Sequence, residues 1–197
     1  MKKIIATAIV AISAIVSVNA QSRSSQEVGT FSVRPYVGGT CGVVTNSKVD
    51  TGGRFGLAAG ADVQYMFNNW FAVSVGGEFN QGGWSYNEGA YKDKTVHMDV
   101  VAVPVMANFY VCKGLALKAG LAPTFVVNTS IDGQKFDDDE IAKFDLTGNA
   151  GISYEFKNGL MLEARINAGS VKLLKDDKRG DKSSRQGIGM LTLGYRF

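Results

Sequence analysis

The sequence predicts an all-β protein, an eight-stranded antiparallel up-and-down transmembrane β-barrel. Three observations lead to this prediction: apolar and polar residues alternate along eight segments, the links between the segments alternate between short and long, and the chain begins with an export signal. Alternation with a period of two places successive side chains on opposite faces of a strand. Short links at one rim and long links at the other are typical of barrels that cross a membrane.

Residues 1–20 have the organisation of a secretory signal peptide. Two lysines give the positive start, an apolar run follows, and the segment ends on small residues at Ala20. The apolar run is shorter than the ~20 residues that a membrane-spanning helix needs. We therefore expect cleavage after Ala20, export to the outer membrane of a Gram-negative cell, and a mature barrel domain over residues 21–197.

The composition of the chain agrees with a curved sheet. It contains 24 glycines and only three prolines, which favours tightly curved strands over disorder. Without the leader, the chain contains 19 basic and 18 acidic residues, so its net charge is close to zero. This balance gives no support to nucleic-acid binding, which requires a basic surface.

Turn residues and alternation set the expected strand boundaries. The eight strands are predicted at residues 30–42, 54–67, 70–82, 95–112, 115–128, 143–156, 160–173 and 185–197. Three links, at residues 68–69, 113–114 and 157–159, are short and contain the Asn and Gly residues that suit tight hairpins. The other four links are long and polar, near residues 43–53, 83–94, 129–142 and 174–184. We expect these long links to be extracellular.

The second, fifth and sixth strands alternate most regularly. Their apolar faces are predicted to contact lipid through residues such as Leu57, Leu121 and Ile152. The fourth strand is irregular, because Met98 and Val100 lie on the parity opposite to the other apolar residues of that strand. Either a bulge shifts the phase there, or that part of the strand has risen above the bilayer.

The last strand ends on an aromatic residue. Tyr195 and Phe197 share one face, and such an ending resembles the closing strand of outer-membrane barrels, in which the terminal aromatic belongs to the assembly signal. Aromatic residues also gather beside the short links. This set comprises Phe67, Trp70, Phe71, Phe109, Tyr154, Phe156, Tyr195 and Phe197. A ring of aromatics at one level is typical of a membrane interface and favours a membrane barrel over a soluble one such as a lipocalin.

Several short segments resemble a known family, the small outer-membrane β-barrel proteins of Bacteroidota that are called PorT-like. They lie at residues 103–106, 115–120, 151–156 and 159–165, and the most specific is Gly-Leu-Met-Leu-Glu-Ala-Arg at 159–165. The resemblance runs over nearly the whole mature chain and implies an eight-stranded outer-membrane barrel. It implies no agreed biochemical activity.

Eight charged residues are predicted to point into the lumen: Arg34, Asp62, Glu78, Lys118, Glu155, Glu163, Arg165 and Arg196. They could line an ion pathway or form a plug of neutralising ion pairs. An eight-stranded barrel is only wide enough for its own side chains, and buried charges must be paired. The geometry therefore favours a structural plug, with Glu163 and Arg165 at its centre.

Enzymatic activity is not expected. The single histidine, His97, shares parity with Asp99, but a nucleophile would have to come from Ser74, Ser85 or Ser130 through a favourable strand register. The acidic run at residues 137–140 lacks the ligand spacing of an EF-hand loop. We expect no cofactor and no metal.

Cys41 and Cys112 are expected to stay unbridged, because the predicted strand order puts them at opposite rims, beyond the ~7 Å limit for a disulfide.

Taken together, these patterns predict a small, monomeric, non-enzymatic barrel with a structural or surface-recognition role in the envelope. Its expected partners are outer-membrane lipid, lipopolysaccharide and, during biogenesis, the barrel-assembly machinery. A narrow porin-like channel, a secretion-accessory barrel and, last, a lipid-modifying enzyme are the alternatives.

Overall fold

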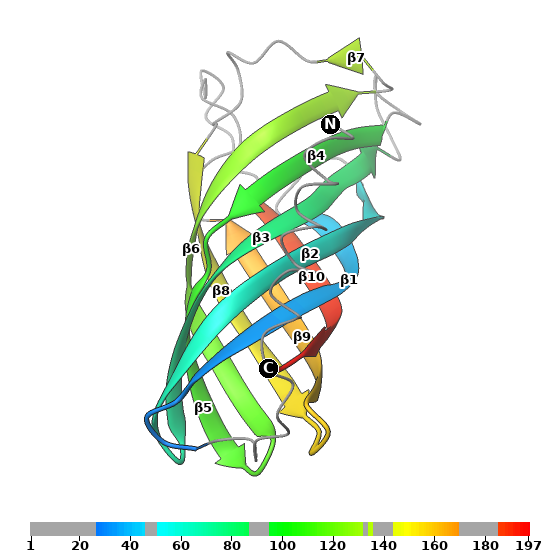
Figure 1. Cartoon of the computed structure of the whole chain (residues 1–197). Helices are drawn as coiled ribbons and strands as arrows, with labels where there is room; N and C mark the ends of the chain where they lie inside the picture. Colours follow the sequence, from blue (N-terminus) through cyan, green and yellow to red (C-terminus); the bar gives the residue numbers. More distant parts are fainter. Residues whose placement is uncertain (1–26, 46–50, 87–94, 132–133, 136–143, 170–184) are drawn as a thin grey trace.

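A computed structural model describes residues 27–45, 51–86, 95–131, 134–135, 144–169 and 185–197. In this part of the chain, antiparallel strands form one sheet that closes on itself into a barrel (Figure 1). The strands are β1 (Phe31–Thr45), β2 (Thr51–Asn68), β3 (Phe71–Tyr86), β4 (Thr95–Ala102), β5 (Val105–Cys112), β6 (Leu115–Ile131), β7 (Gln134–Lys135), β8 (Phe144–Glu155), β9 (Leu160–Gly169) and β10 (Arg185–Tyr195). Within the described residues, no helix combines the length and the hydropathy needed to cross a membrane.

The barrel wall has eight strand positions, here called staves, one of which is split into two strands. This confirms the predicted fold class. β4 and β5 are two pieces of one stave, because both pair with β3 on one side and with β6 on the other. The two-residue β7 pairs only with β6 and takes no part in closure. Each remaining strand pairs with its neighbours in chain order, and β10 returns to pair with β1.

The end of the chain closes the barrel. β10 pairs with β1 in antiparallel register, from Tyr36 opposite Gly194 to Thr45 opposite Arg185. Beyond β10, the Phe197 N–H donates to the Val33 carbonyl at 2.9 Å, and the Val33 N–H donates back to the Phe197 carbonyl at 3.3 Å. No sheet edge is left at this seam, which removes the unpaired backbone groups that a membrane does not tolerate.

The three short links lie together at one end of the barrel (bottom of Figure 1). Each is a tight turn of the kind that its residues predicted. Gly114 and Gly159 adopt positive φ values of 90° and 86°, and the Asn68 and Asn158 side chains accept backbone N–H bonds two residues on, at 3.1 and 3.2 Å. Glycine and asparagine are therefore required here by backbone geometry.

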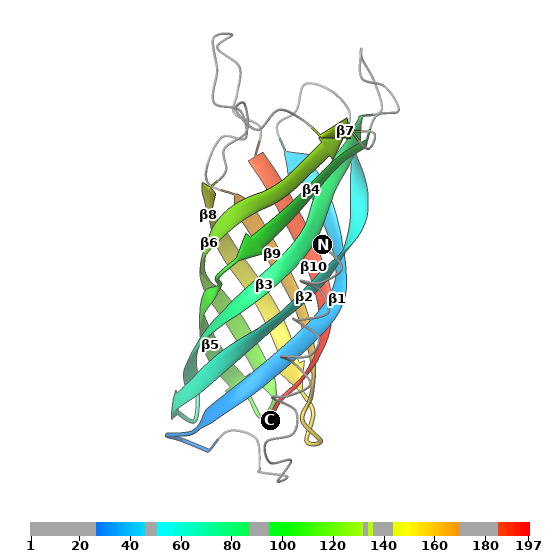
Figure 2. The same cartoon turned by 45° about the horizontal axis from the view of Figure 1, so that its top comes forward.

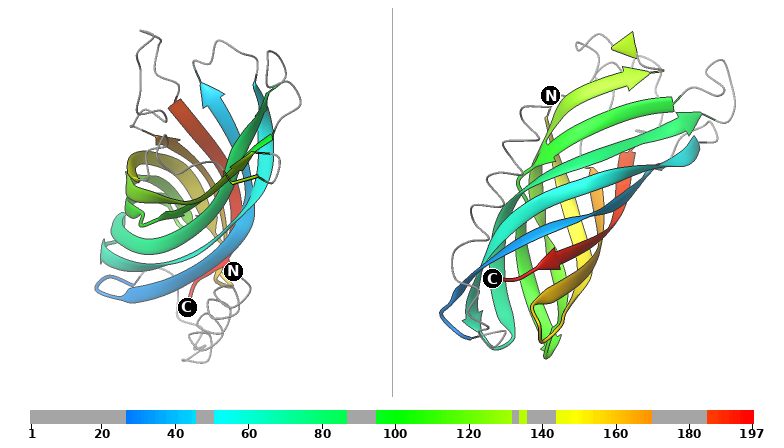
Figure 3. Two further views of the ribbon diagram at one scale, coloured as in Figure 1. Left: turned by 90° about the horizontal axis from the view of Figure 1, so that it is seen from above. Right: turned by 45° about the vertical axis from the view of Figure 1, so that its right-hand side comes forward.

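At the opposite end the barrel is uneven. β2, β3 and β6 contain 18, 16 and 17 residues, whereas β8, β9 and β10 contain 12, 10 and 11. The longer strands rise as a wall on one side, as Figures 2 and 3 show. The predicted first, second, third and fifth strands were consequently too short at this end, because ladder pairing continues into sequence that was assigned to the long links.

Other predicted boundaries also move. The predicted strand at 160–173 ends at Gly169, and residues 170–173 lie outside the described part of the chain. The last strand ends at Tyr195 rather than at residue 197, although Phe197 still bonds to Val33.

The two faces of the wall differ as the alternation predicted. Leu57, Leu121, Ile152 and Leu193 are exposed on the outside, between 44% and 64% of their surface. Most inward residues are polar, glycine or small, and five buried methionines lie among them together with Tyr36, Val100, Tyr110 and Ile188. The outward aromatic side chains contact one another near the short turns, and Phe31 and Tyr65 extend this belt beyond the predicted set, with centroids 4.7 Å apart.

The fourth stave keeps one phase throughout. Met98 and Val100 point inward and are 3% and 4% exposed, while Val101 lies on the outer face. The register shift lies between Asp99 and Val100 in the pairing with β6, where the partner of Val100 is Val126 and the partner of Asp99 is Asn128. The extra residue, Val127, thus belongs to the neighbouring strand, and the two apolar side chains simply line the upper lumen.

Two prolines explain why this stave is split into β4 and β5. The Val103 N–H donates to the Pro123 carbonyl at 2.9 Å, and the Gly76 N–H donates to the Pro104 carbonyl at 3.0 Å. The reciprocal bonds cannot form, because proline has no N–H. The interruption marks the level at which the taller wall begins to depart from the barrel (Figure 3).

Both cysteines are free. Cys41 pairs with Phe55 and Gly189 toward the upper end of β1, whereas Cys112 is the exposed last residue of β5, next to a short turn. The two positions lie toward opposite ends of the barrel, as the strand order predicted.

Introducing a charge on the outer face should destabilise the folded barrel. Ile152→Arg and Leu193→Arg should each lower the free energy of unfolding by roughly 2–4 kcal/mol at midplane depth, because arginine must leave water for hydrocarbon. Urea titration of protein refolded in bilayers measures this. Lys157→Arg, at an exposed turn position, is the control and should change nothing. Water-accessible spin labels at Leu57, Val73, Leu121, Ile152 and Leu193 would contradict the assignment of this face to lipid.

The cysteines give a second test, of strand order. Folded protein should migrate identically on reducing and non-reducing gels, and two thiols should react after denaturation without reductant. A Cys41–Cys112 peptide found by mass spectrometry would refute the order.

Candidate functional site

The eight predicted lumenal charges all lie inside the barrel wall. They come from six strands and from the residue after β10, because each occupies an inward position of its strand. Their side chains are between 1% and 13% exposed. The four basic residues are matched by four acidic ones, so the set as a whole is neutral.

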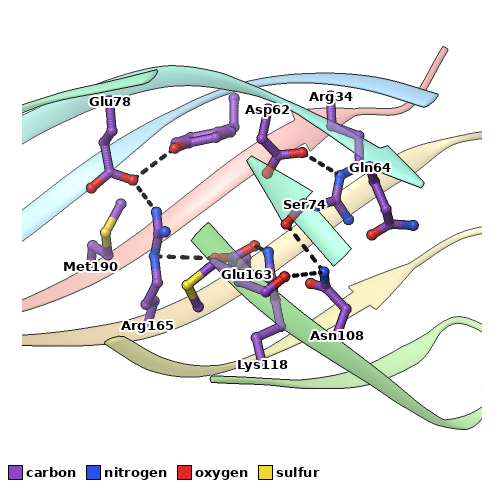
Figure 4. A network of polar contacts seen from close by, with 12 residues as sticks. Arg34, Asp62, Gln64, Ser74, Glu78, Asn108, Lys118, Glu163, Arg165 and Met190 are labelled. Atoms are coloured by element: carbon purple, nitrogen blue, oxygen red, sulfur yellow. Dashed lines mark hydrogen bonds and ion pairs between the residues drawn. The ribbon is translucent and has the colours of Figure 1, made fainter. Parts of the chain in front are cut away.

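One ion pair joins neighbouring strands. Arg34 of β1 lies directly opposite Asp62 of β2, and Arg34 Nε donates to Asp62 Oδ1 at 2.7 Å. The register that pairs β1 with β2 therefore also sets the geometry of this salt bridge. Figure 4 shows both side chains turned toward the rest of the network.

A longer chain of charges crosses the lumen (Figure 4). Lys118 Nζ of β6 donates to Glu163 Oε2 of β9 at 2.5 Å. Arg165 Nε lies 3.2 Å from Glu163 Oε1, an ion-pair contact, and Arg165 Nη2 reaches Glu78 Oε2 of β3. The alternating sequence of positive and negative groups thus connects β6, β9 and β3. Glu163 and Arg165 form its centre, where the sequence placed them.

The last pair lies near the short turns. Arg196 Nε is 2.5 Å from Glu155 Oε1. This contact joins the residue after β10 to the end of β8, across the stave formed by β9. It helps to position the C-terminal segment that bears Tyr195 and Phe197, whose rings lie 4.7 Å apart.

Sequence reasoning missed the neutral members of the network. The Tyr36 hydroxyl donates to Glu78 Oε2 at 2.7 Å, and the Arg165 guanidinium lies 5.8 Å from the centroid of the Tyr36 ring. Gly60 makes room for this ring, because a Cβ there would lie 2.7 Å from the Tyr36 Cζ and hydroxyl oxygen. Strand parity alone could have found Tyr36, since it shares the inward face with Arg34.

Apolar side chains, interleaved with neutral polar ones, fill the lumen on both sides of the chain of charges from Lys118 to Glu78. Met66, Ala72, Tyr110 and Ala116 form a buried cluster near the short turns. Other apolar side chains line the upper lumen, namely Ala58, Met98, Val100, Ala102, Ile188 and Met190. All five methionines of the described residues are buried in the lumen, where their flexible side chains fill irregular space.

His97 does not form a nucleophile–base pair. Ser130 is directly opposite His97 in the register of β4 and β6, the register that a catalytic pair would require. Among the described residues, however, no hydrogen bond joins His97 to Ser130 or to Asp99. Asp99 instead accepts a bond from Asn128 Nδ2 at 3.2 Å. Ser74 is excluded because it faces the lumen, where it accepts a bond from Asn108.

No group of His, Cys, Asp or Glu side chains is placed to hold a metal ion in the described part of the chain. The acidic run at 137–140 and the side chain of Ser85 fall outside it.

A closed eight-stranded barrel with an apolar outside and a charged, filled lumen defines a small transmembrane β-barrel. The chain belongs to the outer membrane protein beta-barrel domain family, whose pattern matches residues 19–169. It is thus a small outer-membrane barrel protein. No curated protein matches it in sequence.

Solved structures share this fold. Ail of Yersinia pestis, the attachment invasion locus protein, superposes with a TM-score of 0.56 at 20% identity, and its complex with the heparin analogue sucrose octasulfate superposes with 0.57 at 18%. Both matches cover 87% of this chain and 100% of Ail. Neisserial surface protein A matches with a TM-score of 0.48 at 14% identity, over 87% of this chain and 100% of that one.

Removing the central arginine should destabilise the barrel strongly. Arg165→Ala removes the cation paired with Glu78 and leaves Glu163 with Lys118 alone, and breaking a buried pair in this way typically costs about 3–5 kcal/mol. Urea titration should show a lower midpoint. Lys113→Ala, at an exposed turn, should leave the midpoint unchanged. If both variants unfold like the wild type, the network does not stabilise the fold.

Proposed function

We propose that this protein is a non-enzymatic outer-membrane barrel with a closed lumen and a structural or surface-recognition role in the cell envelope. The paired lumenal charges support this most directly, because four basic and four acidic groups neutralise one another inside a barrel that is too narrow for a wide channel. Buried methionine and alanine side chains lie among the polar ones on both sides of the central charges and fill space that ions would need. Recognition is then left to the parts of the chain outside the bilayer.

The remaining parts of this proposal come from the sequence. We infer that the leader is cleaved after Ala20, that the assembly machinery reads Tyr195 and Phe197, and that the mature protein is a monomer with no nucleic-acid partner. Outer-membrane lipid and lipopolysaccharide surround it. The short motifs, above all residues 159–165, support a place among the PorT-like barrels of Bacteroidota.

Surface recognition would involve anionic saccharides. The sequence between β9 and β10 is rich in basic residues, namely Lys172, Lys175, Lys178, Arg179 and Lys182. Ail, which shares the fold, was crystallised with a sulfated heparin analogue. Basic side chains pair well with phosphate and sulfate groups. We propose that this segment binds the phosphorylated saccharides of lipopolysaccharide.

Three other functions would each give a different experimental result. A narrow porin-like channel would show single-channel conductance in planar bilayers. A secretion-accessory barrel would show loss of surface cargo when the gene is deleted. A lipid-modifying enzyme would show an altered lipid A profile in a strain carrying His97→Ala, and Ser130→Ala should then have the same effect because Ser130 faces His97.

The closed lumen predicts negligible conductance. Wild-type protein in planar bilayers should carry almost no current, whereas Arg165→Ala should leak, because unpaired carboxylates draw water into the lumen. Lys113→Ala should behave like the wild type. A robust, ion-selective wild-type current that Arg165→Ala leaves unchanged would replace the plug with a channel.

The recognition proposal predicts anion binding that depends on the basic segment. A variant with Lys175→Glu, Lys178→Glu and Arg179→Glu should elute from immobilised heparin at lower salt than the wild type, because like charges repel. Lys113→Glu with Lys157→Glu, at the short-turn rim, is the control and should elute close to the wild type. Equal elution of the wild type and the loop variant would contradict the proposal.

A further inference from the structure

Glu78 is saturated with hydrogen bonds at the upper side of the charged zone. Its Oε2 accepts from the Tyr36 hydroxyl and from Arg165 (Figure 4). Its Oε1 accepts from Asn80 Nδ2 at 2.5 Å and from Asn167 Nδ2 at 3.4 Å. An ionised carboxylate only accepts hydrogen bonds, so both amides must turn their NH₂ groups toward it.

This orientation leaves two carbonyl oxygens facing away from Glu78. Asn80 is 1% exposed and Asn167 is 7% exposed, and the Oδ1 atom of each has no hydrogen-bond partner among the described residues. Exchanging the O and N atoms of either amide would set an oxygen against the carboxylate. The unpartnered acceptors are therefore a consequence of the charge on Glu78.

A third acceptor lies beside them. Asn149 of β8 is directly opposite Asn167 of β9, on the inward face, and is 5% exposed. Its Oδ1 is also buried without a partner in the described part of the chain. Arg165 Nε, the nearby donor that makes no hydrogen bond, lies 3.2 Å from Glu163 Oε1 and has that carboxylate as its ion-pair partner. The three amide oxygens have no such partner, and as acceptors they can bind a hydrogen-bond donor or a cation.

We propose that the upper lumen binds a small cluster of water molecules between β3, β8 and β9, held by the side-chain carbonyl oxygens of Asn80, Asn149 and Asn167. A buried acceptor without a donor loses its hydration with nothing in exchange. Buried water commonly satisfies such groups, making about three hydrogen bonds each. A bound cation would also suit the oxygens, but the surrounding charges are already balanced, so the site needs no further positive charge. The inference does not depend on the proposed recognition role.

A crystal structure of the mature protein tests the proposal directly. We expect ordered solvent peaks within hydrogen-bonding distance of all three Oδ1 atoms. Direct bonds between the amides, or a loop side chain that donates to them, would overturn it.

Coupling between variants gives a second test. Asn80 and Asn149 are not bonded to each other, yet shared water should make the effects of Asn80→Leu and Asn149→Leu on the urea midpoint non-additive. Asn108→Leu, on β5 beside Ser74, is the matched control and should add independently to Asn149→Leu. Additive effects in the first pair would count against the cluster.

A change of cation distinguishes water from a bound ion. If the urea midpoint of the wild type falls when Na⁺ is exchanged for N-methylglucamine at equal ionic strength, a cation occupies the site and the assignment to water is overturned.

Discussion

The narrow lumen is the constraint on which the structure depends. An eight-stranded barrel has room for its own side chains and little more, so each inward charge must meet an opposite charge. The chain from Lys118 through Glu163 and Arg165 to Glu78 satisfies this across the lumen, and thereby ties β6, β9 and β3 together. A slip of one residue in any of these strands would turn its charges toward lipid. The ion pairs thus specify strand register as well as filling the interior.

The polar and apolar layers of the lumen have separate roles. Charged groups orient one another at the centre, and Glu78 collects four donors there. Methionines and alanines fill the remaining space above and below, since a thioether adapts to irregular gaps. Polar contacts and apolar side chains together fill the lumen.

Backbone hydrogen bonds close the barrel wall at the seam between the first and last strands. The Phe197–Val33 bonds seal the first strand against the last, so no edge remains at the C-terminus. Pro104 and Pro123 remove two ladder bonds at one level, and the taller wall begins there (Figure 3). The upper part of this wall carries Asp99 and His97 on its outer face, away from the lumen, which keeps them apart from the charged network.

The sequence by itself determined the eight strands of the wall, the short turns and the inward position of the eight charges predicted to face the lumen, because a period of two is read directly from the residues. It did not determine the height of the wall, since ladder bonds continue through polar residues without any apolar pattern. It left the phase near Met98 open, because Met98 and Val100 are apolar side chains that face the lumen and so break the pattern of apolar residues outside. It also could not assign partners. Which carboxylate meets Arg165, and which way the amides of Asn80 and Asn167 turn, depend on distances across the lumen that exist only once the barrel has closed.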